Sequence, residues 1–160
     1  MEHIPAWHAA KVGMRYPARV IAVGESVLLL NLDLTLIAPG RSPTILASLR
    51  FDETVDSDRA RSLSLKDSVQ VVLIVVDPHP GSERAFASLP ANPEWLTWND
   101  QTVRRLARHI RETREFGLMP ILADALEDAG CNDTTLLEHC RQTQIDGWRD
   151  WAVELLATQQ

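Results

Sequence analysis

The sequence of 160 residues contains only two cysteines, Cys131 and Cys140, and only seven glycines. Two cysteines cannot build a framework of several disulfides, so we expect reduced thiols and a cytoplasmic location. The motifs GxGxxG, GxxxxGK[ST] and GxSxG are all missing, which excludes the common phosphate-binding loops and the nucleophile elbow of many hydrolases. The sequence therefore predicts no cofactor and identifies no catalytic residue.

Long hydrophobic segments are missing too. The longest apolar runs, residues 26–38 and 69–76, are interrupted or far shorter than the roughly 20 residues that a membrane helix needs. The first 20 residues lack the basic and apolar regions of a secretory signal. We expect a soluble protein without a membrane partner.

Positive charge is scarce, because 16 Lys and Arg stand against 22 Asp and Glu and give a net charge of −6. Residues 1–93 contain nine basic and ten acidic residues, and residues 94–160 contain seven and twelve, so the two parts carry −1 and −5. Neither part has the basic excess that phosphate binding requires. The charge thus argues against nucleic acid as the partner.

The first half of the chain is a series of strand patterns. Runs rich in Val, Ile and Leu are bounded by turn residues, and they lie at 18–23, 26–38, 44–51, 68–76 and 84–89. Residues 69–76 are almost all apolar, which is typical of a strand buried on both faces or inside a small barrel. The polar residues 52–62 predict an exposed loop or a short helix. About five short strands favour a closed barrel, since closure removes exposed edges.

After residue 90 the hydrophobic pattern changes to the period of helices. One face at helical spacing is formed by Val103, Leu106, Ala107 and Ile110. Either Thr97 or Asn99 fits the N-cap of this first helix, and the sequence alone does not choose between them.

Three further helices are expected. The second begins at Met119–Pro120 and ends at Gly130, a residue suited to a left-handed cap. Its predicted apolar face consists of Ile121, Leu122, Ala125, Leu126 and Ala129. The third begins after Asn132 or Asp133 and buries Leu136, Leu137 and Cys140, and the fourth begins after Asp146 and uses Trp148, Trp151, Ala152 and Leu155.

These patterns predict an α+β protein with a small OB-like β-barrel of about five strands, followed by a compact bundle of four short helices. We expect a β-rich domain over residues 1–90 and a helical module over residues 91–160.

Residues 13–32 and 63–89 resemble the opening and closing strands of S1-like domains of the OB-fold, and Lys66, Asp67 and the run after them carry the likeness. The resemblance implies the barrel. S1-like domains that bind RNA present aromatic and basic residues on their middle strands. Here residues 35–51 contain one aromatic, Phe51, and two cations, Arg41 and Arg50, so the fold is expected without the binding.

The second half resembles a short helical module that recurs near the C-termini of many planctomycete proteins. The matching residues are Trp95, Leu96, Trp98, Asn99, residues 122–131 and His139 to Arg141. The module has no assigned activity, so the resemblance implies a relationship and not a function.

Three groups of reactive side chains are candidates for chemical sites. Cys131, His139 and Cys140 have no CxxC spacing, and His139 and Cys140 point about 100° apart on a helix, which argues against a metal and for a buried, inert Cys140. Asp124 and Asp128 share one helix face, which is typical of a solvated surface. His79, Ser82 and Glu83 fall on a turn. No sequence signature joins His109 or His139 to a thiol.

The binding candidates are four tryptophans and three arginines. Trp95, Trp98, Trp148 and Trp151 either close the core or present anchors for a protein partner. Arg104, Arg108 and Arg111 lie on one side of the first helix, as a solvated surface or one that faces a partner or the other domain. The leading hypothesis is a non-enzymatic protein-protein interaction or adaptor module. The alternatives are a nucleic-acid-binding OB-type module and a small enzyme with an unrecognised site.

Overall fold

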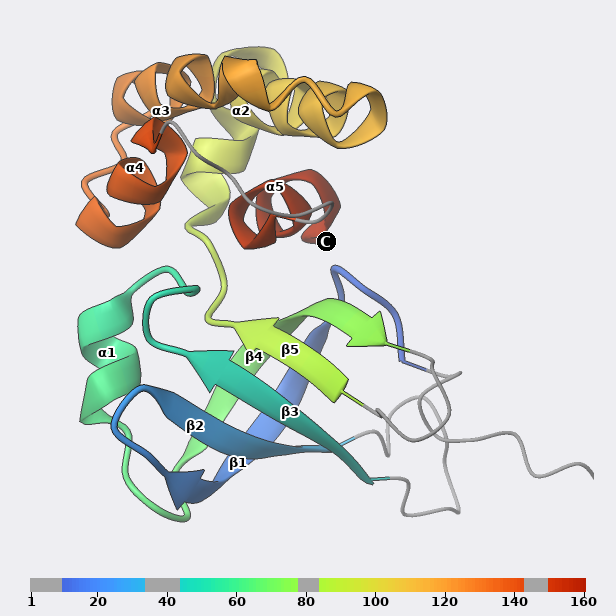
Figure 1. Ribbon diagram of the computed structural model, residues 1–160, viewed down its shortest axis with the longest axis vertical. Coiled ribbons are helices and arrows are strands. Elements are labelled where there is room, and N and C mark those ends of the chain that lie inside the picture. The colour runs from blue at the N-terminus through green and yellow to red at the C-terminus, as the bar shows by residue number, and fades with distance from the viewer. Residues whose placement is uncertain (1–9, 34–43, 78–83, 143–149) are drawn as a thin grey trace, which may run out of the picture.

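Five strands close into a β-barrel in the computed structural model, which describes residues 10–33, 44–77, 84–142 and 150–160. The strands are β1 (Arg15–Val23), β2 (Val27–Asp33), β3 (Thr44–Arg50), β4 (Ser68–Asp77) and β5 (Arg84–Ser88). They follow the order β1-β2-β3-β5-β4 around the barrel, and only the short β3–β5 pairing is parallel (Figure 1). The predicted OB-like fold is confirmed.

The barrel interior is filled by every second residue of the strands, as a period of two requires. In β2 and β3 the buried and exposed positions alternate, because each strand has one face toward the interior and one toward water. The interior residues include Tyr16, Ala18, Val20, Leu28, Leu30, Leu32, Ile45, Ala47 and Leu49. Leu46, on the outer face of β3, is 51% exposed.

Strand β4 differs because both of its faces are covered. The four residues from Val71 to Ile74 are each at most 3% exposed. One face of β4 belongs to the barrel interior, and helix α5 (Trp151–Thr158) packs against the strand from outside. The continuous apolar run in the sequence is explained by this double burial.

The remaining helices differ in length. They are α1 (Ser57–Ser62), between β3 and β4, and α2 (Pro93–Thr113), α3 (Met119–Asp128) and α4 (Thr134–Arg141), with a 3-10 turn η2 (Phe116–Leu118) before α3. Helix α2 is the longest of them at 21 residues. In Figure 1, α2 to α5 form a layer above one end of the barrel. No helix among the described residues is both long and apolar enough to span a membrane.

The turn between α3 and α4 agrees with its sequence pattern. Gly130 adopts φ +90°, which suits glycine, and the Asp133 side chain caps α4 by accepting from the Leu136 N–H at 3.0 Å. The predicted burial of Leu136, Leu137 and Cys140 is confirmed.

Three local predictions were wrong. Helix α2 begins earlier than expected, at Pro93 with Asn92 as its cap, and is interrupted by left-handed residues from Asn99 to Gln101. Ile121 is 53% exposed, because the buried face of α3 is shifted by one position from the predicted face. The buried face consists of Met119, Leu122, Ala123 and Leu126 together with Ala125. The last helix begins only at Trp151, capped by Asp150; residues 143–149, which include Asp146 and Trp148, lie outside the described residues.

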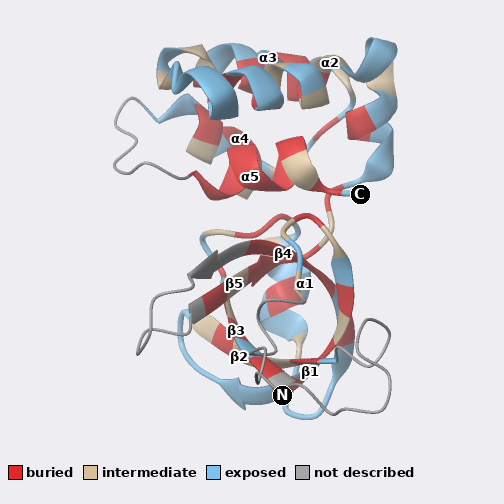
Figure 2. Ribbon diagram, turned by 90° about the vertical axis from the view of Figure 1, so that its right-hand side faces the viewer, coloured by how far each residue is buried: buried red, intermediate tan, exposed pale blue. Residues whose placement is uncertain are grey.

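Helix α5 connects the two parts of the molecule. All seven residues from Trp151 to Ala157 are buried, and Figure 2 shows the helix in red between the barrel and the outer helices. Just after α5, the Gln159 side chain is paired with the backbone of Ala91, accepting from its N–H at 2.8 Å and donating to its carbonyl at 3.0 Å. Barrel and helices therefore share one hydrophobic core.

Gly13 lies where the N-terminal segment touches the end of α5. Its N–H donates to the Leu73 carbonyl at 2.8 Å, and its own carbonyl accepts from the Gln160 N–H at 2.9 Å. Its φ is +87°, and a Cβ there would lie 2.0 Å from the Thr158 carbonyl oxygen. Only glycine fits both constraints.

The substitution Gly13→Ala should therefore destabilise the protein by at least about 2 kcal/mol, through backbone strain and displacement of α5. Urea unfolding followed by circular dichroism measures the change. Gly117→Ala is the matched control, because no atom lies within 4 Å of the added Cβ, and it should be nearly neutral. Equal stability of the two variants would contradict this account of Gly13.

Candidate functional site

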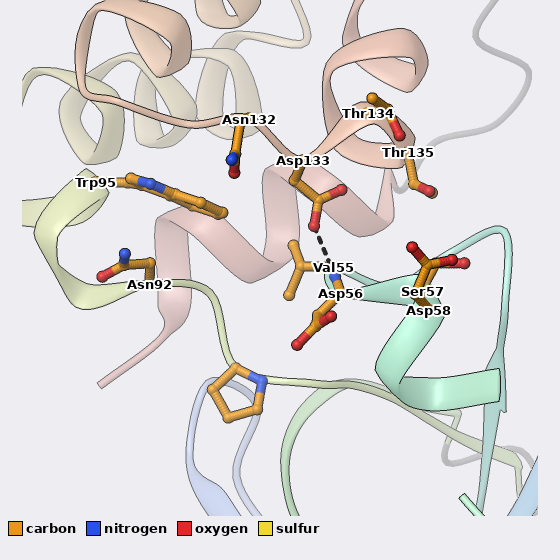
Figure 3. A pocket seen from close by; sticks show the side chains of 11 residues that line it. Val55, Asp56, Ser57, Asp58, Asn92, Trp95, Asn132, Asp133, Thr134 and Thr135 are labelled. Carbon is orange, nitrogen blue, oxygen red and sulfur yellow. Dashed lines mark hydrogen bonds between the residues drawn. The ribbon is translucent and has the colours of Figure 1, made fainter. Parts of the chain in front are cut away.

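A pocket opens where the barrel meets the helices, and we call it the junction pocket. Its volume is about 480 Å³. One wall comes from the loop before α1, another from the segment before α2, and a third from the start of α4 (Figure 3). It is lined by Val55, Asp56, Ser57, Asp58, Pro90, Asn92, Trp95, Asn132, Asp133, Thr134 and Thr135.

The barrel wall of the junction pocket is held by a buried hydroxyl pair. Thr54 Oγ1 and Ser88 Oγ lie 3.0 Å apart, and both residues are fully buried. The hydroxyl of Ser88 accepts from the Val55 N–H at 3.3 Å, and that of Thr54 accepts from the Leu89 N–H at 2.9 Å. These bonds fix the loop before α1 to the end of β5, because buried polar groups need partners.

Asp133 joins the two sides of the pocket. One carboxylate oxygen caps α4, and the other accepts from the backbone N–H of Asp56 at 2.6 Å (Figure 3). Asp56 is in the left-handed region at φ +51° and precedes α1. A single side chain therefore links the start of α4 to the start of α1.

The junction pocket is acidic. Its lining contains three carboxylates, those of Asp56, Asp58 and Asp133, and neither Lys, Arg nor His. The charge of Asp133 is partly offset by the N-terminus of the helix it caps. Asp56 and Asp58 are exposed, and no side-chain hydrogen bond or ion pair holds their carboxylates among the described residues. The pocket can thus stabilise a positively charged group.

Trp95 supplies the aromatic wall of the pocket. It is 8% exposed, so most of the indole packs inside the protein while one part borders the cavity. A cation over such a ring gains cation–π attraction in addition to the carboxylates.

The other predicted tryptophans occupy different places. Trp151 is 7% exposed in the core, where its ring lies 5.1 Å from that of His139. Trp98 is half-buried at the interruption of α2, and Trp148 lies outside the described residues. Trp95 and Trp151 therefore serve the core, and only Trp95 also borders the pocket.

Two of the three predicted arginines on α2, Arg108 and Arg111, contact α5. Arg108 Nε donates to the Ala157 carbonyl at 3.2 Å, and Arg111 Nε contacts the Glu154 carboxylate at 3.1 Å. Arg104 lies one turn earlier on α2, half-buried, with its pKa lowered by burial and by the charge of Arg108. None of the three arginines lines the junction pocket.

His139 pairs with a buried carboxylate. Its Nε2 lies 2.6 Å from Asp150 Oδ2, while the other oxygen of Asp150 accepts from two N–H groups at the start of α5. Burial raises the pKa of the nearby Glu53 above its usual value. The His139–Asp150 pair links α4 to the residue that caps α5.

The remaining reactive groups are separate from the pocket. His109 contacts Glu115 at 3.1 Å on the surface, and the described residues contain no cluster of His, Cys, Asp or Glu that could hold a metal. Burial raises the pKa of Cys131 to about 11 and that of Cys140 to about 12. The turn with His79, Ser82 and Glu83 lies outside the described residues.

No pattern in the sequence predicted the junction pocket. Asp56 and Asp133 are 77 residues apart, and no periodic pattern relates such distant positions. The usable signals were local, because acidic and hydroxyl residues concentrate in "DETVDSD" and in "NDTT", each of which runs into the first turn of a helix.

Neither the known protein families nor the curated proteins include a match to this chain. Among solved structures it is similar to a chain of the a/eIF2alpha-aDim2p-rRNA complex from Pyrococcus horikoshii OT3, at 19% identity over 75% of this chain and 67% of that one, with a TM-score of 0.38. It is also similar to the intact alpha subunit of aIF2 from Pyrococcus abyssi, at 18% identity over 92% of this chain and 60% of that one, with a TM-score of 0.38. At these identities the likeness concerns the fold alone.

Both thiols should resist modification in the folded protein. At pH 8 a thiol with a pKa of about 11 is ionised in only about one molecule in a thousand, and burial blocks access. A chromogenic disulfide reagent should label neither Cys131 nor Cys140 until guanidinium unfolds the chain, when both react. Rapid labelling of the folded protein would disprove the burial.

The free energy of unfolding should also decline above about pH 9, because unfolded thiols ionise near that pH while the folded thiols stay neutral.

Asp133→Ala should cost about 1–2 kcal/mol of unfolding free energy, because it removes the cap of α4 and the acceptor for the Asp56 N–H. Asp128→Ala, at the C-terminal end of α3, removes the same charge without a cap and should be neutral or slightly stabilising. Chemical unfolding of both variants measures the difference. If Asp133→Ala leaves the unfolding free energy unchanged, the hydrogen bonds of Asp133 to α4 and to Asp56 do not stabilise the fold.

Proposed function

We propose that this protein is a non-enzymatic interaction module that binds a positively charged segment of another protein in the junction pocket. The acid-lined cavity between barrel and helices is the observation that supports the proposal. Its size suits one or two side chains, and its lining offers carboxylates, hydroxyls and amides to the N–H groups of Arg or Lys.

The charges in the pocket favour a cationic segment over nucleic acid. Phosphates would meet Asp56, Asp58 and Asp133 with no lining cation to neutralise them. The described part of the OB-like barrel also offers few stacking groups, since Phe51 is buried beneath the guanidinium of Arg61 at 4.9 Å. The wider acidity of the chain would draw a basic partner toward this face.

A fluorescein-labelled peptide of alternating Arg and Gly tests the proposal by fluorescence anisotropy. We expect binding that weakens as salt rises from about 0.05 to 0.5 M, since screening acts on exposed charges. The double variant Asp56→Asn, Asp58→Asn should bind about tenfold more weakly, at roughly 0.5–1 kcal/mol for each charge. Asparagine keeps the size of each side chain and tolerates the left-handed backbone at position 56.

The matched control is Asp128→Asn, which removes an exposed carboxylate outside the pocket. If it weakens binding as much as each pocket substitution, the attraction is general and the junction pocket is not the site. If the protein binds labelled single-stranded RNA but does not bind the basic peptide, the nucleic-acid alternative replaces the proposal.

A further inference from the structure

A second charged site of opposite sign lies on α2, away from the junction pocket. Four arginines lie on this helix, and three of them have a clear structural partner. Arg105 pairs with Asp100 at 3.0 Å and Arg111 with Glu154 at 3.1 Å. Arg108 donates to the carbonyl of Ala157 in the last turn of α5, where a helix favours positive charge. Arg104 differs from these three.

Arg104 lies opposite no acidic side chain. The contacts of Arg111 with Glu154 and of Arg108 with Ala157 show that α2 and α5 run antiparallel, so Arg104, one turn further, lies beyond the C-terminal end of α5. Among the described residues no carboxylate lies within 4.0 Å of Arg104. The half-buried guanidinium has Arg108 as its charged neighbour, and burial with this repulsion lowers its pKa.

The placement of Arg104 near Arg108 without a counter-charge lowers the stability of the fold. Like charges four residues apart on a helix repel each other, and a partly buried cation gains from a counter-charge. Arg108 uses Nε for the Ala157 carbonyl. Its side chain is four residues from Arg104 and therefore on the same face of the helix, so the terminal N–H groups of the two arginines can serve one ligand. Two neighbouring guanidinium groups present the donor pattern that binds a carboxylate through paired hydrogen bonds.

We propose that Arg104 and Arg108 form a clamp for a single carboxylate side chain of a protein segment. The net charge of −5 on the helical half of the chain repels any polyanion, so the clamp suits one isolated carboxylate and not the repeated charge of a nucleic acid. The clamp is independent of the junction pocket, since neither arginine lines that cavity.

A labelled peptide with a single Glu among Gly and Ser residues tests the clamp by fluorescence anisotropy. Arg104→Gln should weaken its binding at least fivefold, and Arg104→Lys should weaken it less, because lysine keeps the charge but loses the planar pair of donors. Arg105→Gln removes the same charge from the same helix and should leave binding unchanged, since Arg105 is 68% exposed and already paired with Asp100.

A stability measurement separates this role from a structural one. Arg104→Gln should leave the urea midpoint unchanged or raise it slightly, because the substitution relieves repulsion, whereas a structural arginine would lower the midpoint when removed. The clamp is refuted if the wild-type protein does not bind the acidic peptide, or if Arg105→Gln weakens binding equally. The clamp would also be refuted if Arg104→Gln abolished the binding of single-stranded RNA and left the binding of the peptide unchanged.

Discussion

Helix α5 is buried on every side, and the arrangement of the molecule depends on that burial. Its outer neighbours are α2 and α4, and its inner neighbour is β4. A helix of eight residues would be unstable alone in water, so tertiary packing must supply its stability. The polar bonds lie at its two ends, where Asp150 caps the first turn and Gln159 pairs with Ala91. Apolar burial and end bonds together hold the helical layer on the barrel.

The junction pocket is a consequence of that docking. Helix α5 sets the distance between α4 and the barrel, and Asp133 then reaches the backbone of Asp56 across the remaining gap. Thr54 and Ser88 fix the barrel wall, and the His139–Asp150 pair holds α4 to α5. Rigid elements therefore position the polar groups of the pocket, of which Asp133 and Asn92 also cap helices while the carboxylates of Asp56 and Asp58 remain open to a ligand.

Local patterns predicted much of the fold. The alternation in β2 and β3, the apolar run of β4, Gly130 and the Asp133 cap are each decided by neighbouring residues, and the structure agrees. The errors arose where tertiary packing decides. Ile121 is as apolar as Leu122, yet only contact with the other helices determines which of the two is buried. The pocket needed the same global information, because Asp56 and Asp133 meet only in the folded chain. The boundary between a domain at residues 1–90 and a module at 91–160 stays a prediction.

The order of β4 and α5 along the chain has a consequence for folding. The outer face of β4, with Val72 and Ile74, is translated well before the helix that covers it. Until then a growing chain exposes a strand that is apolar on both faces, and such strands are prone to pair with one another. Docking of α5 therefore does two things at once, because it completes the shared core and covers the strand surface that is most prone to aggregation.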